Sequence, residues 1–69
     1  MQQTVLIIDD EPDIRELLDI TISRMGLHTI AVGNVRDALQ ALSKTENISL
    51  CLTDIKLPDG SGLEIVRHI

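Results

Sequence analysis

The sequence predicts an α/β fold in which helices cover both faces of an open, doubly wound parallel sheet. Three short apolar runs alternate with segments of helical periodicity in the order β-α-β-α-β-α, and the first and third runs end directly in aspartate. Crossovers between parallel strands are right-handed, which lets successive helices cover the sheet. With 69 residues, the chain forms one domain at most.

The first strand and helix are predicted before residue 27. Residues 5–8, Val-Leu-Ile-Ile, form an apolar run typical of a strand that is buried on both faces. Pro12 suits the first turn of a helix, and Gly26 suits the end of one. Glu11 and Arg15, at helical spacing, are expected to pair on the surface. The apolar positions between these signals predict an amphipathic helix: Ile14, Leu17, Leu18, Thr21, Ile22 and Met25.

The second strand and helix follow directly. Residues 28–32 have the composition of a short strand, and Gly33 with Asn34 forms a turn in which Asn34 can cap a helix. Residues 45–47 end that helix. Its predicted buried side carries Val35, Ala38, Leu39 and Leu42.

The third strand, residues 49–53, ends at Asp54. Residues 57–60, Leu-Pro-Asp-Gly, are turn residues, and Ser61 with Glu64 has the spacing of a capping box that starts a third helix. The apolar positions predicted for that helix are Leu63, Ile65, Val66 and Ile69.

Composition excludes several classes of function. A net charge of -5 and the absence of Phe, Tyr and Trp argue against nucleic-acid binding by this segment. A single cysteine excludes an internal disulfide, and Cys51 within an apolar strand is expected to be a small buried hydrophobe. The longest apolar run is too short to span a membrane, so we expect a cytoplasmic protein with no membrane partner.

Acidic residues mark the predicted working edge of the sheet. Ligands of open parallel sheets bind beyond the carboxyl ends of the strands, where Asp9 and Asp10 follow the first strand and Asp54 follows the third. If these strands are neighbours, Asp10 and Asp54 could ligate one hard cation, and Mg²⁺ is the natural candidate because it binds one or two carboxylates plus a phosphate. Aspartates at strand ends also serve as turn and cap residues, so both interpretations stay open on spacing alone.

The motifs around these aspartates resemble those of the receiver domain of two-component response regulators. The matching residues are 6–12, Leu-Ile-Ile-Asp-Asp-Glu-Pro, and 52–63, Leu-Thr-Asp-Ile-Lys-Leu-Pro-Asp-Gly-Ser-Gly-Leu. The resemblance implies a flavodoxin-like fold with Asp54 as phosphoacceptor, Asp9, Asp10 and Asp54 as Mg²⁺ ligands, and Lys56 as a further ligand through its backbone carbonyl. A sensor histidine kinase is the implied partner, and the chain is a signalling module, not an enzyme.

The resemblance also implies a place within a larger protein. Among response regulators, the sequence is most similar to those of the NtrC type, in which a receiver precedes domains that activate sigma-54 polymerase and bind DNA. A complete receiver has five strands, so residues 1–69 are expected to be its N-terminal part with strand order 2-1-3, without the fourth and fifth strands. We expect phosphorylation-driven switching to need those later parts.

Three other functions are alternatives to a phosphorylated receiver. A Mg²⁺-dependent phosphatase with an aspartyl nucleophile would carry Asp-x-Asp after the first strand, which residues 9–11 lack. A flavin-binding module is disfavoured by the acidic edge and by the lack of aromatic rings. A receiver-like interaction module that is never phosphorylated stays open, because only a phosphorylation assay distinguishes it.

The predicted third strand also suggests self-association. In the implied strand order it is an unpaired apolar edge. The resemblance also implies that the helix covering one face of the first strand belongs to the later parts of the domain, so Val5, Ile7, Leu50 or Leu52 would be exposed on one side or buried by another chain. We therefore expect residues 1–69 to form a homodimer or a higher oligomer.

Overall fold

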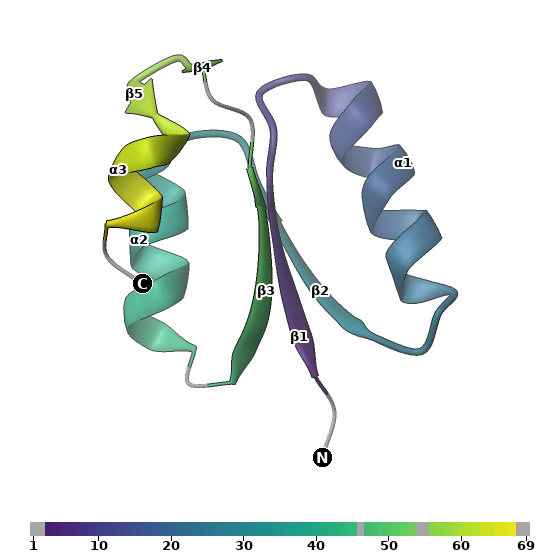
Figure 1. Cartoon of the computed structure of the whole chain (residues 1–69). Helices are drawn as coiled ribbons and strands as arrows, with labels where there is room; N and C mark the ends of the chain where they lie inside the picture. Colours follow the sequence, from purple (N-terminus) through teal and green to yellow (C-terminus); the bar gives the residue numbers. More distant parts are fainter. Residues whose placement is uncertain (1–2, 46, 54–55, 68–69) are drawn as a thin grey trace.

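The fold was analysed in a computed structural model that describes residues 3–45, 47–53 and 56–67. Strands and helices alternate as predicted, with a short hairpin before the third helix (Figure 1). The elements are β1 (Thr4–Ile8), α1 (Pro12–Ser23), β2 (His28–Val32), α2 (Val35–Lys44), β3 (Ile48–Thr53), β4 (Lys56–Leu57), β5 (Gly60–Ser61) and α3 (Gly62–Val66).

The main sheet has the order β2-β1-β3, and both pairings are parallel, which confirms the predicted fold class and strand order. In β1, Ile8 pairs with Val32 of β2 and with Thr53 of β3, so the three strands end level with one another. Seen edge-on in Figure 1, α1 lies on one side of the sheet, and α2 and α3 lie on the other. The carboxyl ends of the strands therefore share one edge.

The central strand β1 supplies the core to both faces, since alternate strand residues point to opposite sides. Leu6 and Ile8 pack against α2, the hairpin and α3, in a cluster that also contains Val35, Ala38, Leu57 and Ile65. Val5 and Ile7 pack against Ile22 of α1, with Leu18 and Leu27 at the margin. All five residues of β1 are buried, as the unbroken apolar run predicts.

The two faces differ in how completely they are covered. On the α1 side of β3, Leu50 and Leu52 are 53% and 36% exposed, although their partners on β1, Val5 and Ile7, are buried. The expectation that Val5, Ile7, Leu50 or Leu52 would be exposed is therefore met by the two leucines on β3. Val5 and Ile7 are buried because α1 lies over β1.

Several apolar residues predicted on the buried faces of α1 and α3 are exposed in the structure. Ile22 of α1 and Ile65 of α3 are buried as expected, but Leu17 is 61% exposed, and Met25 and Leu63 are also exposed, as is Val66. The apolar stripes are wider than the strip of sheet that each helix covers. Ile69 lies outside the described residues.

The helix ends largely follow the predicted capping. Asn34 Oδ1 accepts a hydrogen bond of 2.8 Å from the Asp37 amide at the start of α2. Ser61 Oγ accepts one of 3.1 Å from the Leu63 amide at the start of α3, so Ser61 caps the helix as predicted, but through Leu63 and not through Glu64 as in a capping box. Gly26, after α1, has φ of 85°, a left-handed conformation that favours glycine.

The predicted turn at residues 57–60 is a tight antiparallel hairpin. Leu57 pairs with Gly60, and Lys56 pairs with Ser61, so β4 and β5 flank Pro58 and Asp59. In the described part of the chain, no helix is long and apolar enough to cross a membrane.

Candidate functional site

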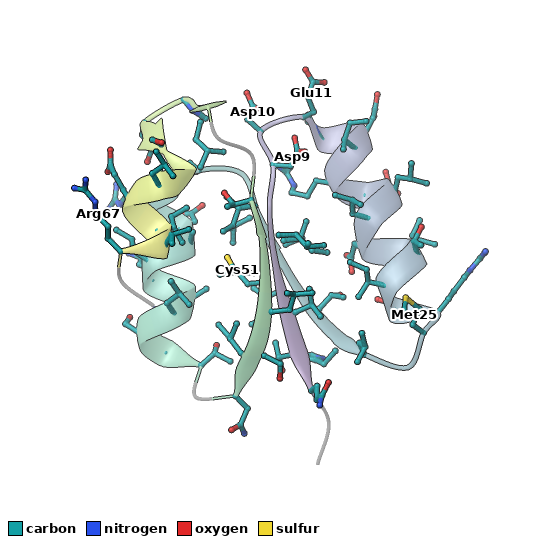
Figure 2. The ribbon with its side chains drawn as sticks, in the orientation of Figure 1. Asp9, Asp10, Glu11, Met25, Cys51 and Arg67 are labelled. Carbon is teal, nitrogen blue, oxygen red and sulfur yellow. The ribbon has the colours of Figure 1, made fainter. Side chains whose placement is uncertain are left out.

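The acidic pair lies at the carboxyl end of β1, as the sequence predicts. The Asp9 amide donates to the Val32 carbonyl (3.1 Å), which joins the end of β1 to the end of β2. Asp9 Oδ1 accepts a hydrogen bond of 2.9 Å from the Glu11 amide, so this half-buried carboxylate is oriented by the turn into α1. Figure 2 shows the exposed Asp10 and Glu11 projecting outward from the edge of the sheet. One carboxylate of the pair is thus anchored, and the other faces solvent.

Arg15 also lies at this edge, where the sequence predicted only a surface pair with Glu11. Its Nη1 donates to the backbone carbonyl of Asp9 at 2.9 Å, and the residue is half-buried. A Cβ atom at Gly33 would lie 2.6 Å from that Nη1, so the absence of a side chain there makes room for the guanidinium. The charge of Arg15 partly offsets the clustered negative charge at the end of β1.

Asp54, the expected phosphoacceptor, lies outside the described residues, as does the side chain of Lys56. The residues on either side of Asp54 and Ile55 are described. Thr53, directly before Asp54, pairs with Ile8, directly before Asp9. The backbone of Lys56 begins β4 and pairs with Ser61. The sheet therefore aligns the strand ends from which the predicted site residues continue.

An open pocket of about 340 Å³ lies beside these strand ends. It is lined by Ile8, Asp9, Leu18, Leu52 and Thr53, and so lies between α1 and the carboxyl ends of β1 and β3. Its lining combines two polar residues, Asp9 and Thr53, with three apolar ones. It places a solvent-accessible space next to the predicted acidic edge.

Asp59, which the sequence predicts only as part of a turn, joins the hairpin to α2. Its carboxylate accepts hydrogen bonds from the Val35 amide (Oδ1, 2.7 Å) and the Arg36 amide (Oδ2, 3.0 Å) in the first turn of α2. These two hydrogen bonds lower the pKa of Asp59 from its ordinary value, and the one from the Val35 amide has the larger effect. The positive charge of Arg36 also lowers this pKa. A carboxylate at a helix N-terminus is also favoured by the helix dipole.

Local sequence patterns could not reveal this contact, because Asp59 and Val35 are 24 residues apart in the chain. The Asn34 cap, by contrast, is a local signal, three residues from its partner Asp37. The N-terminus of α2 therefore has two caps, one within its own sequence and one from the hairpin.

The side-chain oxygen atoms at the end of β1 have the chemistry that Mg²⁺ prefers. The described residues contain no group of three or more His, Cys, Asp or Glu side chains arranged to hold a metal ion. Mg²⁺ needs no such group, because it keeps several waters and commonly binds one or two carboxylates together with phosphate oxygens. Asp9 and Asp10 place carboxylate oxygens, which are hard donor atoms, at one strand end. The residues present therefore fit Mg²⁺ better than they fit a soft metal such as Zn²⁺.

Cys51 lies on the opposite face of β3 from the pocket-lining Leu52, on the side of α2 and α3 (Figure 2). It is half-buried, and desolvation raises the pKa of its thiol, which disfavours the reactive thiolate. The predicted buried hydrophobe is therefore only partly buried, and it packs against the core cluster from its margin.

Comparison with known proteins identifies the family. The family model described as the response regulator receiver domain matches residues 5–69. The chain belongs to the response regulator receiver family. This confirms the resemblance drawn from the motifs around Asp9 and Asp54, and the matched range includes all of the described sheet except Thr4.

Bacterial signalling proteins with curated descriptions resemble this chain in sequence. The chain is 56% identical to the response regulator protein PilR of Pseudomonas aeruginosa over 68 residues, which are 99% of this chain and 15% of PilR. It is 35% identical to sporulation initiation phosphotransferase F of Bacillus subtilis over 69 residues, 100% of this chain and 55% of that protein. The chain thus spans only part of the relatives it matches.

Solved receiver structures share the fold. A response regulator receiver protein from Pseudomonas putida matches with a TM-score of 0.90 at 28% identity, over 100% of this chain and 57% of that chain. A chain from the complex of histidine kinase ThkA with response regulator protein TrrA matches with a TM-score of 0.85 at 34% identity, over 97% and 57%. The flavodoxin-like receiver architecture is therefore the fold of this chain.

Proposed function

We propose that this receiver domain accepts a phosphoryl group on Asp54 from the phosphohistidine of a sensor histidine kinase. Asp9, Asp10, Asp54 and the backbone carbonyl of Lys56 would hold Mg²⁺. The observation that carries the proposal is the parallel pairing of β1 and β3 up to Ile8 and Thr53, after which Asp9 and Asp54 follow. An acidic edge at neighbouring strand ends is the arrangement that Mg²⁺-assisted phosphoryl transfer needs.

The proposed chemistry is nucleophilic substitution at phosphorus. A carboxylate oxygen of Asp54 forms the new P–O bond as the P–N bond to the kinase histidine breaks, and the imidazole leaves with the bonding electron pair. Asp9 is held in place by the Glu11 amide, so its orientation costs no further ordering when the phosphoryl group arrives. Bound Mg²⁺ would supply neutralisation of phosphoryl charge. The receiver is then the acceptor in a signalling reaction.

A histidine kinase partner is supported by the structure of histidine kinase ThkA in complex with response regulator protein TrrA, because this chain matches one chain of that complex. On the chain itself, Ile14 and Leu17 of α1 are exposed near the acidic edge formed by Asp10 and Glu11. Exposed apolar side chains beside a reactive site suit docking of a partner helix. We propose that the kinase binds over this end of α1 in the cytoplasm.

The output of the phosphorylated domain is proposed from the similarity to PilR. That similarity supports an NtrC-type regulator in which other regions bind DNA and act with sigma-54 polymerase. The segment described by this structure is acidic and lacks aromatic residues, so we propose that it makes no direct contact with nucleic acid. We further propose that residues 1–69 are the N-terminal part of a receiver domain, which agrees with their covering 55% and 57% of two proteins that they match.

Phosphate trapping by mass spectrometry tests the proposal on the full-length protein with its kinase or a small phosphodonor. We expect one phosphoryl group on Asp54, no modification of Asp54→Asn, and loss of modification of the wild type when EDTA removes Mg²⁺. Asp13→Asn is the matched control, because Asp13 is an exposed carboxylate in the first turn of α1. It should be modified as the wild type is.

Two results would contradict the proposal. Modification at another residue would show that Asp54 is not the acceptor. A folded wild-type protein that takes no phosphate from either donor would favour the second candidate, a receiver-like interaction module that is not phosphorylated.

We also propose that residues 1–69 by themselves self-associate as a homodimer or a higher oligomer. Leu50 and Leu52 support this, because they form an exposed apolar strip on the edge strand β3. Edge strands with exposed apolar side chains readily pair with another chain.

A further inference from the structure

We propose that Asp59 is a positioning residue for the phosphoacceptor site. By binding the N-terminus of α2, Asp59 would hold the β4–β5 hairpin in place, and with it the backbone carbonyl of Lys56. This inference rests on the proposed function, since the position of Lys56 matters only if this edge binds Mg²⁺ and accepts phosphate. Asp59 itself would touch neither the metal nor the phosphoryl group.

The contact joins two segments that lead to the same edge of the sheet. Asp59 uses both carboxylate oxygens, at 2.7 Å from the Val35 amide and 3.0 Å from the Arg36 amide. The helix that it binds follows β2, whose last residue, Val32, accepts a hydrogen bond from the Asp9 amide. The hairpin is thereby tied, through α2 and β2, to the strand end that carries the acidic pair.

Close packing leaves the hairpin little room to shift. Leu57 is buried in the same cluster as Val35 and Ile65. A Cβ atom at Gly60 would lie 3.1 Å from Val35 Cγ2 and 3.0 Å from Glu64 Oε1, so the hairpin backbone approaches α2 and α3 closely. The hairpin is therefore in contact with both helices, and Asp59 makes its two hydrogen bonds to the first of them.

The hairpin connects this contact to the site in few residues. Asp59 lies in the turn between the paired residues Leu57 and Gly60, and the next pair is Lys56 with Ser61. Holding the turn in place therefore also holds the strand that begins at Lys56. The lowered pKa of Asp59 indicates that its carboxylate is ionised at neutral pH, which is the form that accepts both bonds.

The test compares the two caps of α2 in the full-length protein. Asp59→Ala removes the cap supplied by the hairpin, whereas Asn34→Ala removes the local cap, the hydrogen bond from the Asp37 amide to Asn34 Oδ1. Both variants weaken the same helix end, but only the first releases the hairpin. Mg²⁺ affinity by isothermal titration calorimetry and amide hydrogen exchange of residues 56–61 report on the hairpin separately from overall stability.

We expect Asp59→Ala to weaken Mg²⁺ binding by about threefold to tenfold, somewhat less than is usual for residues that contact metal ligands directly. It should also speed hydrogen exchange in the hairpin. Asn34→Ala should leave both unchanged. Asp59→Asn keeps one acceptor oxygen and should fall between the wild type and Asp59→Ala.

Other results would contradict either the positioning role of Asp59 or the proposed function. Equal Mg²⁺ affinity for Asp59→Ala and the wild type, or an equal loss in Asn34→Ala, would show that Asp59 is only a helix cap. A wild-type protein that binds no Mg²⁺ would contradict the proposed function, and the positioning role with it. In that case faster hairpin exchange in Asp59→Ala would show that the contact is real but serves no metal site.

Discussion

The two faces of the sheet differ in how the chain closes them. On one face, α2, α3 and the hairpin pack over Leu6 and Ile8 in a continuous cluster. On the other, α1 covers β1 through Ile22 and is tied to β2 by the Thr29 hydroxyl, which donates to Asp19, while Leu50 of β3 stays exposed. Core packing is therefore concentrated on the face that holds the hairpin, and the face beside the pocket leaves apolar side chains of β3 exposed.

The largest expected effect separates two leucines on neighbouring strands. Leu6 is fully buried on the closed face, whereas Leu50 is 53% exposed on the open one. Leu6→Ala should lower the free energy of unfolding by about 2–5 kcal/mol, because it leaves a cavity in the core. Leu50→Ala should change it by no more than about 0.5 kcal/mol. Urea denaturation at one protein concentration measures both.

Because a chain of this size has little stability to lose, Leu6→Ala could unfold it entirely. Ile8→Val on the same face gives a graded version, with an expected loss of about 0.5–1.5 kcal/mol. If the Leu6 and Leu50 substitutions cost the same, the two faces are not different in the way described.

A second prediction concerns the exposed strip on the open face. For residues 1–69, replacing Leu50 and Leu52 by lysine should reduce self-association, since charge on an edge strand opposes pairing with another chain. Sedimentation velocity over a wide range of concentrations measures the effect. The control is the double substitution Leu63→Lys and Val66→Lys, which places the same two charges on the exposed outer side of α3. A wild-type segment that stays monomeric throughout would contradict the prediction.

The smallest expected effect is a pH dependence on the closed face. Hydrogen bonds to the ionised carboxylate lower the pKa of Asp59 in the folded protein below its ordinary value of 3.8. The resulting stabilisation is complete above pH 3.8 and is lost as the pH falls through the lower, folded-state pKa. The difference in unfolding free energy between the wild type and Asp59→Asn should therefore be constant near neutral pH and shrink in acid.

Denaturation curves of the two proteins from pH 7 down to pH 2 measure this difference. Asp13→Asn serves as the control, because Asp13 lies in the first turn of α1 on the other face. If the difference between the wild type and Asp59→Asn grows as the pH falls, its sign is opposite to the prediction. The hydrogen bonds to the ionised Asp59 carboxylate would then not stabilise the fold.

Residue patterns along the chain predicted most of the fold because they report local physics. The apolar run of β1, Pro12 at the start of α1 and the Asn34 cap each act within a few residues, and all three are present in the structure. The placement of Asp9 and Asp10 at the edge of the sheet followed from the same patterns. The role of Asp54 came from family resemblance and stays a prediction, since Asp54 lies outside the described residues.

The errors came from contacts that depend on the packed molecule. Leu17 and Leu63 have the spacing of buried helix residues, but helix periodicity gives the direction of an apolar face and not the width that neighbouring elements cover. Arg15 was expected beside Glu11, its neighbour along the helix, yet it reaches the carbonyl of Asp9 where Gly33 leaves space. Each of these outcomes was set by a neighbour from another element.

By itself, the sequence determined the order and types of the main elements, their local caps and the acidic residues that follow two strands, because these depend on interactions within a few residues. Tertiary structure alone decided which face of the sheet is closed and which helix end Asp59 binds. The Asp59–Val35 contact spans 24 residues. It exists only because the crossovers bring the hairpin and the start of α2 to the same edge of the sheet, a placement that depends on packing across the whole domain.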